Sequence, residues 1–319
     1  MLNTEGSMPL DPQIKVILDQ IDALGLPPHY EVGAVQARAN ASSRPRAQGP
    51  DVTSVENQSI PGPDGQVPTR VYKPAGPGPF PAIVWAHGGG MVIGTLETCD
   101  YICRHLCVNV GCVVVSVDYR LAPEHTFPAA PDDFYAATKW VADNADELSV
   151  DVGRISVGGE SAGANLAAAV TLMARERGGP ALVHQTLINP MLDTDFDTAS
   201  YLENAEGYFL TRKTMMWYWE QYLGSDAGTK DPYAAPLQAT DVSGLPPALL
   251  IVGEFDPLRD ETEAYAARLQ AAGVATTCTR YDGGVHNFFN MPPTVDKATQ
   301  AVAQMSDALK AAFASAGAR

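Results

Sequence analysis

A short apolar run, a G-x-S-x-G turn and a helical pattern follow one another in the stretch Ile155-Ser156-Val157-Gly158-Gly159-Glu160-Ser161-Ala162-Gly163. In a tight strand-to-helix turn that exposes a serine, the neighbouring residues have no room for a Cβ atom, which explains both glycines of the pentapeptide. The pentapeptide alone is a weak signal, because the glycine and serine content of the chain gives about 0.1 accidental matches. Its position between a strand and a helix is informative, and it predicts that Ser161 is an exposed nucleophile.

A glycine run, His87-Gly88-Gly89-Gly90, follows a predicted strand at residues 82–85. Glycines allow backbone N–H groups to approach a developing oxyanion, so we expect an oxyanion hole formed by the amides of Gly88, Gly89 and Ala162. A phosphate-binding loop is the competing interpretation of a glycine run. No GK[ST] follows the run and no G-x-G-x-x-G occurs in the chain, which disfavours that interpretation.

A serine nucleophile needs a base, and a histidine base needs a carboxylate that orients it. His286 lies in a glycine-rich loop after the last predicted strand, and Asp256 follows the strand before it. Open α/β sheets place their sites at the carboxyl ends of strands, where both residues fall. We therefore predict a Ser161–Asp256–His286 triad, whose chain order is the one of α/β-hydrolases. Glu254 and Asp260 are the rival acids, and His87 is expected to brace the glycine loop.

Short apolar runs alternate with helical patterns along most of the chain. We expect strands at residues 52–60, 67–72, 82–85, 112–117, 155–157, 183–188, 248–252 and 276–281, and helices at 11–24, 131–142, 162–177, 261–272 and 294–313. Residues 61–65 are typical of a hairpin connection. The later runs indicate a parallel sheet buried on both faces, and hence the α/β class. The stretch between the first helix and residue 50 is poorly patterned.

Residues 193–244 interrupt this alternation and are rich in Met and aromatic residues. Several of these residues occupy adjacent positions, so they cannot all face one core. We favour a lid over a substrate pocket, and ordinary helix packing is the alternative.

The charge balance restricts the partners of the chain. Its 319 residues include 21 Lys+Arg and 37 Asp+Glu, a formal net charge of −16, which would repel nucleic acids and anionic lipid headgroups. No apolar run reaches the roughly 20 residues that span a bilayer. The first fifteen residues do not resemble a signal peptide, so we expect a cytoplasmic location and reduced cysteines.

Three of the five cysteines, Cys99, Cys103 and Cys107, recur every four residues, which places them along one face of a helix. A soft-metal site is conceivable there. We favour the alternative that they fill core-facing positions, because metal sites usually use CxxC pairs. With no H-E-x-x-H or similar spacing in the chain, we expect neither a metal nor a cofactor.

Five motifs together resemble those of the microbial hormone-sensitive-lipase-like carboxylesterases, also called family IV. They are His87–Gly90, Asp118–His125, Gly159–Gly163, Asp256–Glu261 and His286-x-Phe288. The resemblance implies an α/β-hydrolase fold with a mostly parallel eight-stranded sheet flanked by helices and covered by a helical cap. It also implies hydrolysis of short to medium acyl esters, and members of this family often form homodimers. Glu160, Ala164 and Asn287 depart from the usual family pattern.

This resemblance divides the chain into four parts. Residues 1–50 would form N-terminal cap helices and residues 193–244 a cap insertion, while residues 51–192 and 245–319 would form the hydrolase core.

Two other functions stay open. An amidase, or a deacetylase acting on sugars or drug-like esters, could use the same triad, because the triad accepts any activated carbonyl that fits. A non-catalytic ligand receptor is the second alternative, as in the related plant gibberellin receptors, whose catalytic histidine is replaced. The presence of His286 argues against that alternative.

Overall fold

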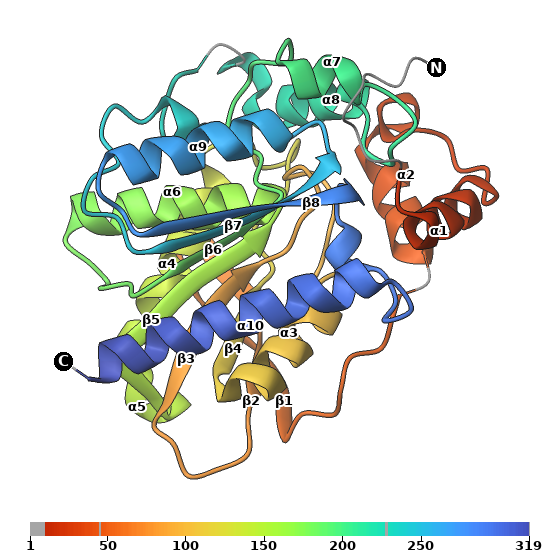
Figure 1. The fold of residues 1–319 in the computed structure, drawn as a ribbon. Helices are drawn as coiled ribbons and strands as arrows, with labels where there is room; N and C mark the ends of the chain where they lie inside the picture. Colours follow the sequence, from red (N-terminus) through yellow and green to blue (C-terminus); the bar gives the residue numbers. More distant parts are fainter. Residues whose placement is uncertain (1–9, 45, 227–228, 319) are drawn as a thin grey trace.

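A computed structural model describes residues 10–44, 46–226 and 229–318 of the chain. Its centre is an eight-stranded sheet with the order β1-β2-β4-β3-β5-β6-β7-β8, in which β2 pairs antiparallel with β1 and β4 and every other pair is parallel (Figure 1). The strands are β1 (Ser54–Gly62), β2 (Gly65–Lys73), β3 (Phe80–Ala86), β4 (Val113–Val117), β5 (Val150–Glu160), β6 (Gln185–Ile188), β7 (Ala248–Phe255) and β8 (Thr276–Val285). The α/β class and the eight-stranded, mostly parallel sheet are confirmed.

Every predicted strand is present, and the largest difference in bounds concerns β5. The sequence predicted only residues 155–157 as a strand. Among residues 151–154 only Val152 is apolar, so this part has no apolar run. In the structure β5 begins at Val150, which pairs with Phe80 of β3. The predicted hairpin is also confirmed, since Gly62 of β1 pairs with Gly65 of β2.

Helices cover both faces of the sheet (Figure 1). The helices are α1 (Pro12–Asp22), α2 (His29–Ser43), α3 (Asp100–Leu106), α4 (Ala129–Asp143), α5 (Ala145–Leu148), α6 (Ala162–Arg177), α7 (Ala199–Glu203), α8 (Arg212–Leu223), α9 (Arg259–Ala271) and α10 (Asp296–Gly317). Because successive side chains of a strand point to opposite faces, the sheet contributes side chains to two hydrophobic cores. Val84 of β3 packs in the core that contains residues of α4, α6 and α9, whereas Ile83 packs in the one that contains residues of α3 and α10.

The two N-terminal helices, α1 and α2, differ in how well the sequence pattern predicts them. The helix predicted at residues 11–24 corresponds to α1, whose Ile14 and Leu18 are buried in the same core as Phe288 and Val295. The sequence pattern predicted no helix at α2, which was implied only by the resemblance, among the N-terminal cap helices. The helix is interrupted at Gly33, where φ is 75°, and it buries only Ala37 and Asn40, so it carries no apolar stripe.

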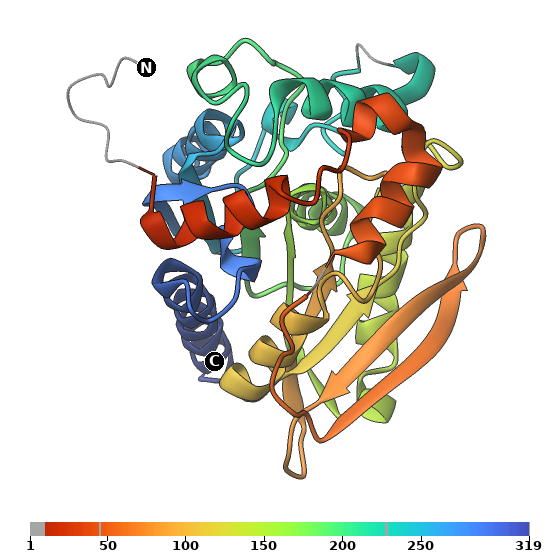
Figure 2. The same cartoon turned by 90° about the vertical axis from the view of Figure 1, so that its right-hand side faces the viewer.

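Four helices that are distant in sequence gather beyond the carboxyl ends of the parallel strands. They are α1, α2, α7 and α8, and α2 contacts α8 directly (Figure 2). Within the aromatic insertion, Met215, Tyr218, Trp219 and Tyr222 of α8 are buried, whereas Met216 is exposed. The buried side chains agree with the alternative of ordinary helix packing, and the lid over a substrate pocket stays a prediction.

The cysteine stripe lies inside a core. Cys99, Cys103 and Cys107 are fully buried in the cluster around α3 and α10, and the Cys99 Sγ lies 3.1 Å from Ser116 Oγ. Burial raises the pKa of Cys107 to about 12 and that of Cys103 well above its usual value. These thiols stay protonated at neutral pH, which suits core packing.

Candidate active site

Ser161 occupies a strained turn between β5 and α6. Its φ of 54° and ψ of −117° lie in a region that L-residues rarely adopt. A Cβ on Gly163 would lie 2.0 Å from the carbonyl oxygen of Ala86, and one on Gly159 would lie 2.3 Å from the backbone of Gly163. The steric explanation of the two glycines is confirmed, because no other residue fits on either side of this turn.

The structure brings the three predicted triad residues together. His286 Nε2 lies 3.1 Å from Ser161 Oγ, and His286 Nδ1 lies 2.9 Å from Asp256 Oδ2. Ser161 is 9% exposed, His286 6% and Asp256 0%. These residues follow or end β5, β8 and β7, so parallel strands place them at one edge of the sheet. The geometry matches a serine, a base that can take its proton, and a carboxylate that orients the base.

Asp256 is fixed independently of His286. Its Oδ1 accepts a hydrogen bond from the N–H of Leu258 at 2.9 Å, which leaves Oδ2 directed at the imidazole. The rival acids are engaged elsewhere, since Glu254 Oε2 accepts from the N–H of Gly283 and Asp260 Oδ2 accepts from the N–H of Ser200. Asp260 thereby connects α9 to α7.

The glycine run forms a tight loop beside Ser161. A Cβ on Gly89, whose φ is 127°, would lie 2.1 Å from the carbonyl oxygen of Ile93. His87 is fully buried, its Nδ1 lies 2.8 Å from the carbonyl oxygen of Gly88, and its ring stacks on Tyr119 at 4.4 Å. These contacts agree with the predicted bracing by His87.

Glu160, directly before the nucleophile, is the buried acid that the sequence singled out only as a departure. Its Oε1 accepts a hydrogen bond from the Gly88 N–H at 3.4 Å, and its Oε2 is buried without a hydrogen-bond partner among the described residues. Burial raises the pKa of Glu160 to about 7, although the Gly88 N–H and the Asn290 side chain act to lower it. Glu160 thus joins the nucleophile turn to the glycine loop.

Sequence reasoning missed Asn189, which follows β6. In the side-chain orientation that satisfies both amide atoms, Asn189 accepts a hydrogen bond from the Asn287 N–H at 2.7 Å and donates one to the Ile251 carbonyl at 3.2 Å. Asn287 follows His286 and has a φ of 63°. Asn189 therefore helps to hold the histidine loop, and its only signal in the sequence was its place at the end of a strand.

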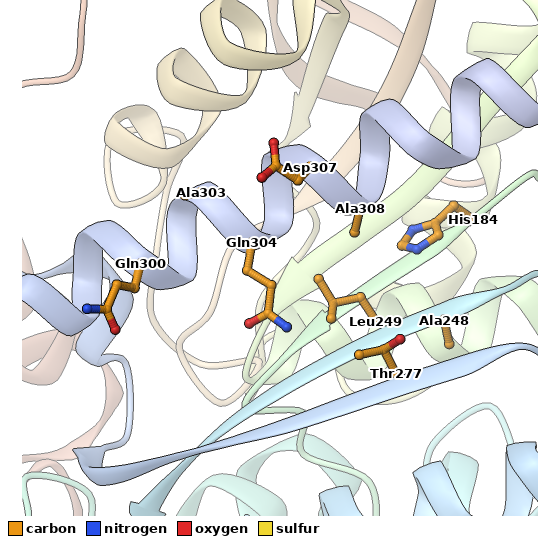
Figure 3. A pocket seen from close by; sticks show the side chains of 9 residues that line it. All are labelled: His184, Ala248, Leu249, Thr277, Gln300, Ala303, Gln304, Asp307 and Ala308. Carbon is orange, nitrogen blue, oxygen red and sulfur yellow. The ribbon is translucent and has the colours of Figure 1, made fainter.

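The groove in Figure 3 lies away from Ser161, His286 and Asp256. His184, Ala248, Leu249 and Thr277 line it beside α10, and they belong to the amino-terminal beginnings of β6, β7 and β8. The triad is at the opposite, carboxyl ends of these strands. Among the described residues, no group of three or more His, Cys, Asp or Glu side chains is arranged to hold a metal ion. The part of the chain that the structure describes contains no helix with the length and apolar character needed to cross a membrane.

Comparisons with known proteins agree with this arrangement. A family model described as the alpha/beta hydrolase fold matches residues 83–290. The carboxylic ester hydrolase LipN of Mycobacterium tuberculosis is 42% identical over 88% of this chain and 77% of its own length, and the carboxylesterase NlhH of the same organism is 38% identical over 95% and 96%. The structure of a hyperthermophilic esterase from Pyrobaculum calidifontis superposes with a TM-score of 0.88 and 42% identity, covering 95% of this chain and 99% of its own.

The chain therefore belongs to the α/β-hydrolase fold family. Within that superfamily it is a member of the hormone-sensitive-lipase-like carboxylesterases, as its motifs indicated.

Proposed function

We propose that this protein is a serine carboxylesterase that hydrolyses short to medium acyl esters through an acyl-enzyme. The observation that carries the proposal is the unbroken set of contacts from Ser161 through His286 to Asp256. The naming of its relatives as carboxylesterases supports the same reaction class. Small esters are accordingly its substrates.

In the proposed reaction His286 takes the Ser161 proton as the serine oxygen attacks the ester carbonyl. Asp256 holds the imidazole in the required tautomer and stabilises the imidazolium. His286 then donates a proton to the leaving alcohol, and an acyl-enzyme remains on Ser161. Water, activated by His286, releases the carboxylic acid and regenerates the serine.

For the tetrahedral oxyanion we propose the amides of Gly88, Gly89 and Ala162 as donors. Ala162 is the first residue of α6, where backbone N–H groups have no acceptor within the helix and the helix dipole favours negative charge. The Gly88 N–H already donates to Glu160. It can therefore contribute to the oxyanion hole only by exchanging or sharing that acceptor.

We further propose that residues 1–50 and 193–244 act as the cap over a core made of residues 51–192 and 245–319. The position of α1, α2, α7 and α8 beyond the carboxyl ends of the strands supports this division (Figure 2). A cytoplasmic location and a homodimer are predictions that come from the sequence and the family resemblance. Size-exclusion chromatography with light scattering tests the second of them.

The decisive experiment compares the initial rate on nitrophenyl butyrate for the parent chain and for Ser161→Ala. We expect the variant to lose several orders of magnitude in kcat, because the covalent nucleophile is removed. Acetate to dodecanoate esters, assayed in parallel, should give the highest kcat/KM at short or medium chains. An inactive parent with a cooperative thermal transition would contradict the esterase assignment, and amide turnover above ester turnover would favour an amidase.

A further inference from the structure

Arg44, the residue that follows α2, is an unusual cation. Every other arginine of the described chain forms an ion pair with an acid or donates a hydrogen bond to a described residue, but Arg44 does neither. Its Nε is buried without a partner in that part of the chain. A desolvated cation is costly unless something compensates its charge. This arginine therefore has an unused capacity to bind an anion.

The groups around Arg44 are aromatic or neutral. Its guanidinium carbon lies 5.6 Å from the centre of the Phe209 ring, and Tyr218 is the other nearby aromatic side chain. His29 Nδ1 lies 2.6 Å from the Tyr218 hydroxyl, while His29 Nε2 is buried without a described partner. Burial, with a smaller contribution from Arg44, lowers the pKa of His29 to about 4, so the imidazole is neutral at working pH.

This arrangement offers hydrogen-bond donors without matching acceptors. If the Tyr218 hydroxyl donates to His29 Nδ1, the imidazole proton is on Nε2, next to no described acceptor. The Arg44 Nε–H is in the same state. A carboxylate, which accepts hydrogen bonds and carries negative charge, satisfies both kinds of donor.

The cluster adjoins the reaction site. A Cβ on Gly90 would lie 2.1 Å from the Tyr218 ring, so this ring packs directly against the glycine loop, and a Cβ on Gly88 of the same loop would lie 3.4 Å from the Ser161 Cβ. Phe209, whose ring lies beside the Arg44 guanidinium, is 36% exposed. Arg44 directly follows α2, which contacts α8, the helix that carries Tyr218. Arg44 is therefore next to a partly exposed ring and near the Tyr218 ring that packs against the glycine loop.

We propose that Arg44 and His29 form an anion-binding subsite, so that the preferred substrates are esters bearing a second, ionised carboxylate, such as the half-ester of a dicarboxylic acid. The inference rests on the proposed esterase function. Hydrolysis of such a half-ester consumes one water and gives the dicarboxylic acid and the alcohol. The net charge of −16 makes a local cation necessary for an anionic substrate.

The test compares monoethyl adipate with ethyl hexanoate at pH 8, with hydrolysis followed by base uptake. The two esters have the same acyl length and differ by a carboxylate in place of a methyl group. For the parent, we expect kcat/KM to be at least as high on the half-ester. Arg44→Met should lower kcat/KM on the half-ester at least tenfold, mainly through KM, and change the neutral ester less than twofold. Arg44→Lys should restore part of the loss, because it returns the charge.

An equal loss on both esters would overturn the proposal and leave Arg44 a packing residue. If Arg44→Met does not fold, the parent alone decides, since a half-ester value below one tenth of the neutral-ester value excludes the subsite. Failure of the esterase function gives a different result, namely no Ser161-dependent turnover of either ester. In that case adipate should still raise the Tm of the parent, should raise that of Arg44→Lys by a smaller amount and should leave that of Arg44→Met unchanged. Equal shifts in all three proteins would contradict anion binding at Arg44.

Discussion

Glu160 is a buried carboxyl group next to Ser161, and its burial opposes ionisation. Its pKa is about 7 in the folded chain, against an ordinary value of 4.5. Between these two values the folded state binds more protons than the unfolded state, so the free energy of unfolding decreases as pH rises. The stabilisation associated with the neutral acid is complete below about pH 4.5 and is lost through pH 7.

We therefore expect Glu160→Gln to remove a pH-dependent loss of stability. The amide mimics the neutral acid and keeps an acceptor for the Gly88 N–H. Relative to the variant, the parent should lose up to about 3 kcal/mol between pH 5 and 8.5. Urea unfolding at several pH values measures this difference.

The matched control is Glu56→Gln on the exposed face of β1. Its unfolding free energy should follow that of the parent at each pH. Parallel curves for the parent and Glu160→Gln would show that the Glu160 carboxyl ionises equally in both states.

For single residues, local patterns predicted the three side chains that the structure brings together. Ser161 and the two glycines belong to one pentapeptide, whereas His286 and Asp256 follow from their places after strands. The contact of Glu160 with Gly88 joins residues 72 positions apart in the sequence. Arg44 has no ion pair with a described acid because the chain folds so that none lies close to it. Such facts depend on side-chain packing, which has no period in the sequence.

Among the elements, the loop after β4 is joined to α4 by a buried ion pair. Arg120 donates through Nε and Nη2 to the two carboxylate oxygens of Asp133, each at 2.9 Å, and its backbone N–H donates to the same group at 3.0 Å. Asp133 is 1% exposed. Arg120 also pairs with the exposed Asp64 at 2.9 Å, so loss of the Asp133 charge removes its buried partner and leaves only a solvent-screened one.

Asp133→Asn should lower the free energy of unfolding by about 3 kcal/mol, because the amide keeps the shape but not the charge. Asp132→Asn, one residue earlier, is the control. Asp132 lies 3.6 Å from Arg177 and both side chains are about a third or more exposed, so we expect less than about 1 kcal/mol there. Urea unfolding of both variants tests the contrast, and equal losses would argue against a special contribution of the buried pair.

Elements with a regular apolar pattern were predictable, and irregular ones were not. Helix α6 has the predicted bounds, because thirteen of its residues are buried and Gly178, whose φ is 79°, ends it directly after Arg177. The pattern did not predict helix α2, because the helix is interrupted at Gly33 and its Val35 side chain is 77% exposed. Its position depends on the contact with α8, which lies far along the chain.

For the whole molecule, the excess of 37 acidic over 21 basic residues predicts self-repulsion that opposes the compact state. Salt screens this repulsion, with a Debye length that falls from about 30 Å at 0.01 M to about 8 Å at 0.15 M. We expect the Tm to rise between 10 and 300 mM NaCl, measured calorimetrically at pH 8. A decrease would mean that the surface ion pairs outweigh the net charge.

The hydrophobic pattern of the sequence predicts the strands of the sheet but not the order in which they lie side by side. Hydrophobic runs identify strands, but they do not state that β4 lies between β2 and β3. That order follows from the crossovers of the whole chain.

The segment between β6 and β7 leaves and rejoins the sheet at adjacent strands. β6 and β7 are parallel, with Gln185 paired with Ala248 and Ile188 with Ile251. The segment therefore leaves the carboxyl end of β6 and returns to the amino end of β7, about 11 Å away, from a rise of about 3.3 Å per residue and a strand spacing of about 4.8 Å. Doubling the length of a flexible loop costs only about 0.6 kcal/mol of closure entropy. We therefore expect residues 193–244, the proposed cap insertion, to tolerate replacement by the matching segment of a relative. Such a graft offers a route to new substrate ranges, and it keeps Asn189, Ser161 and His286 in place.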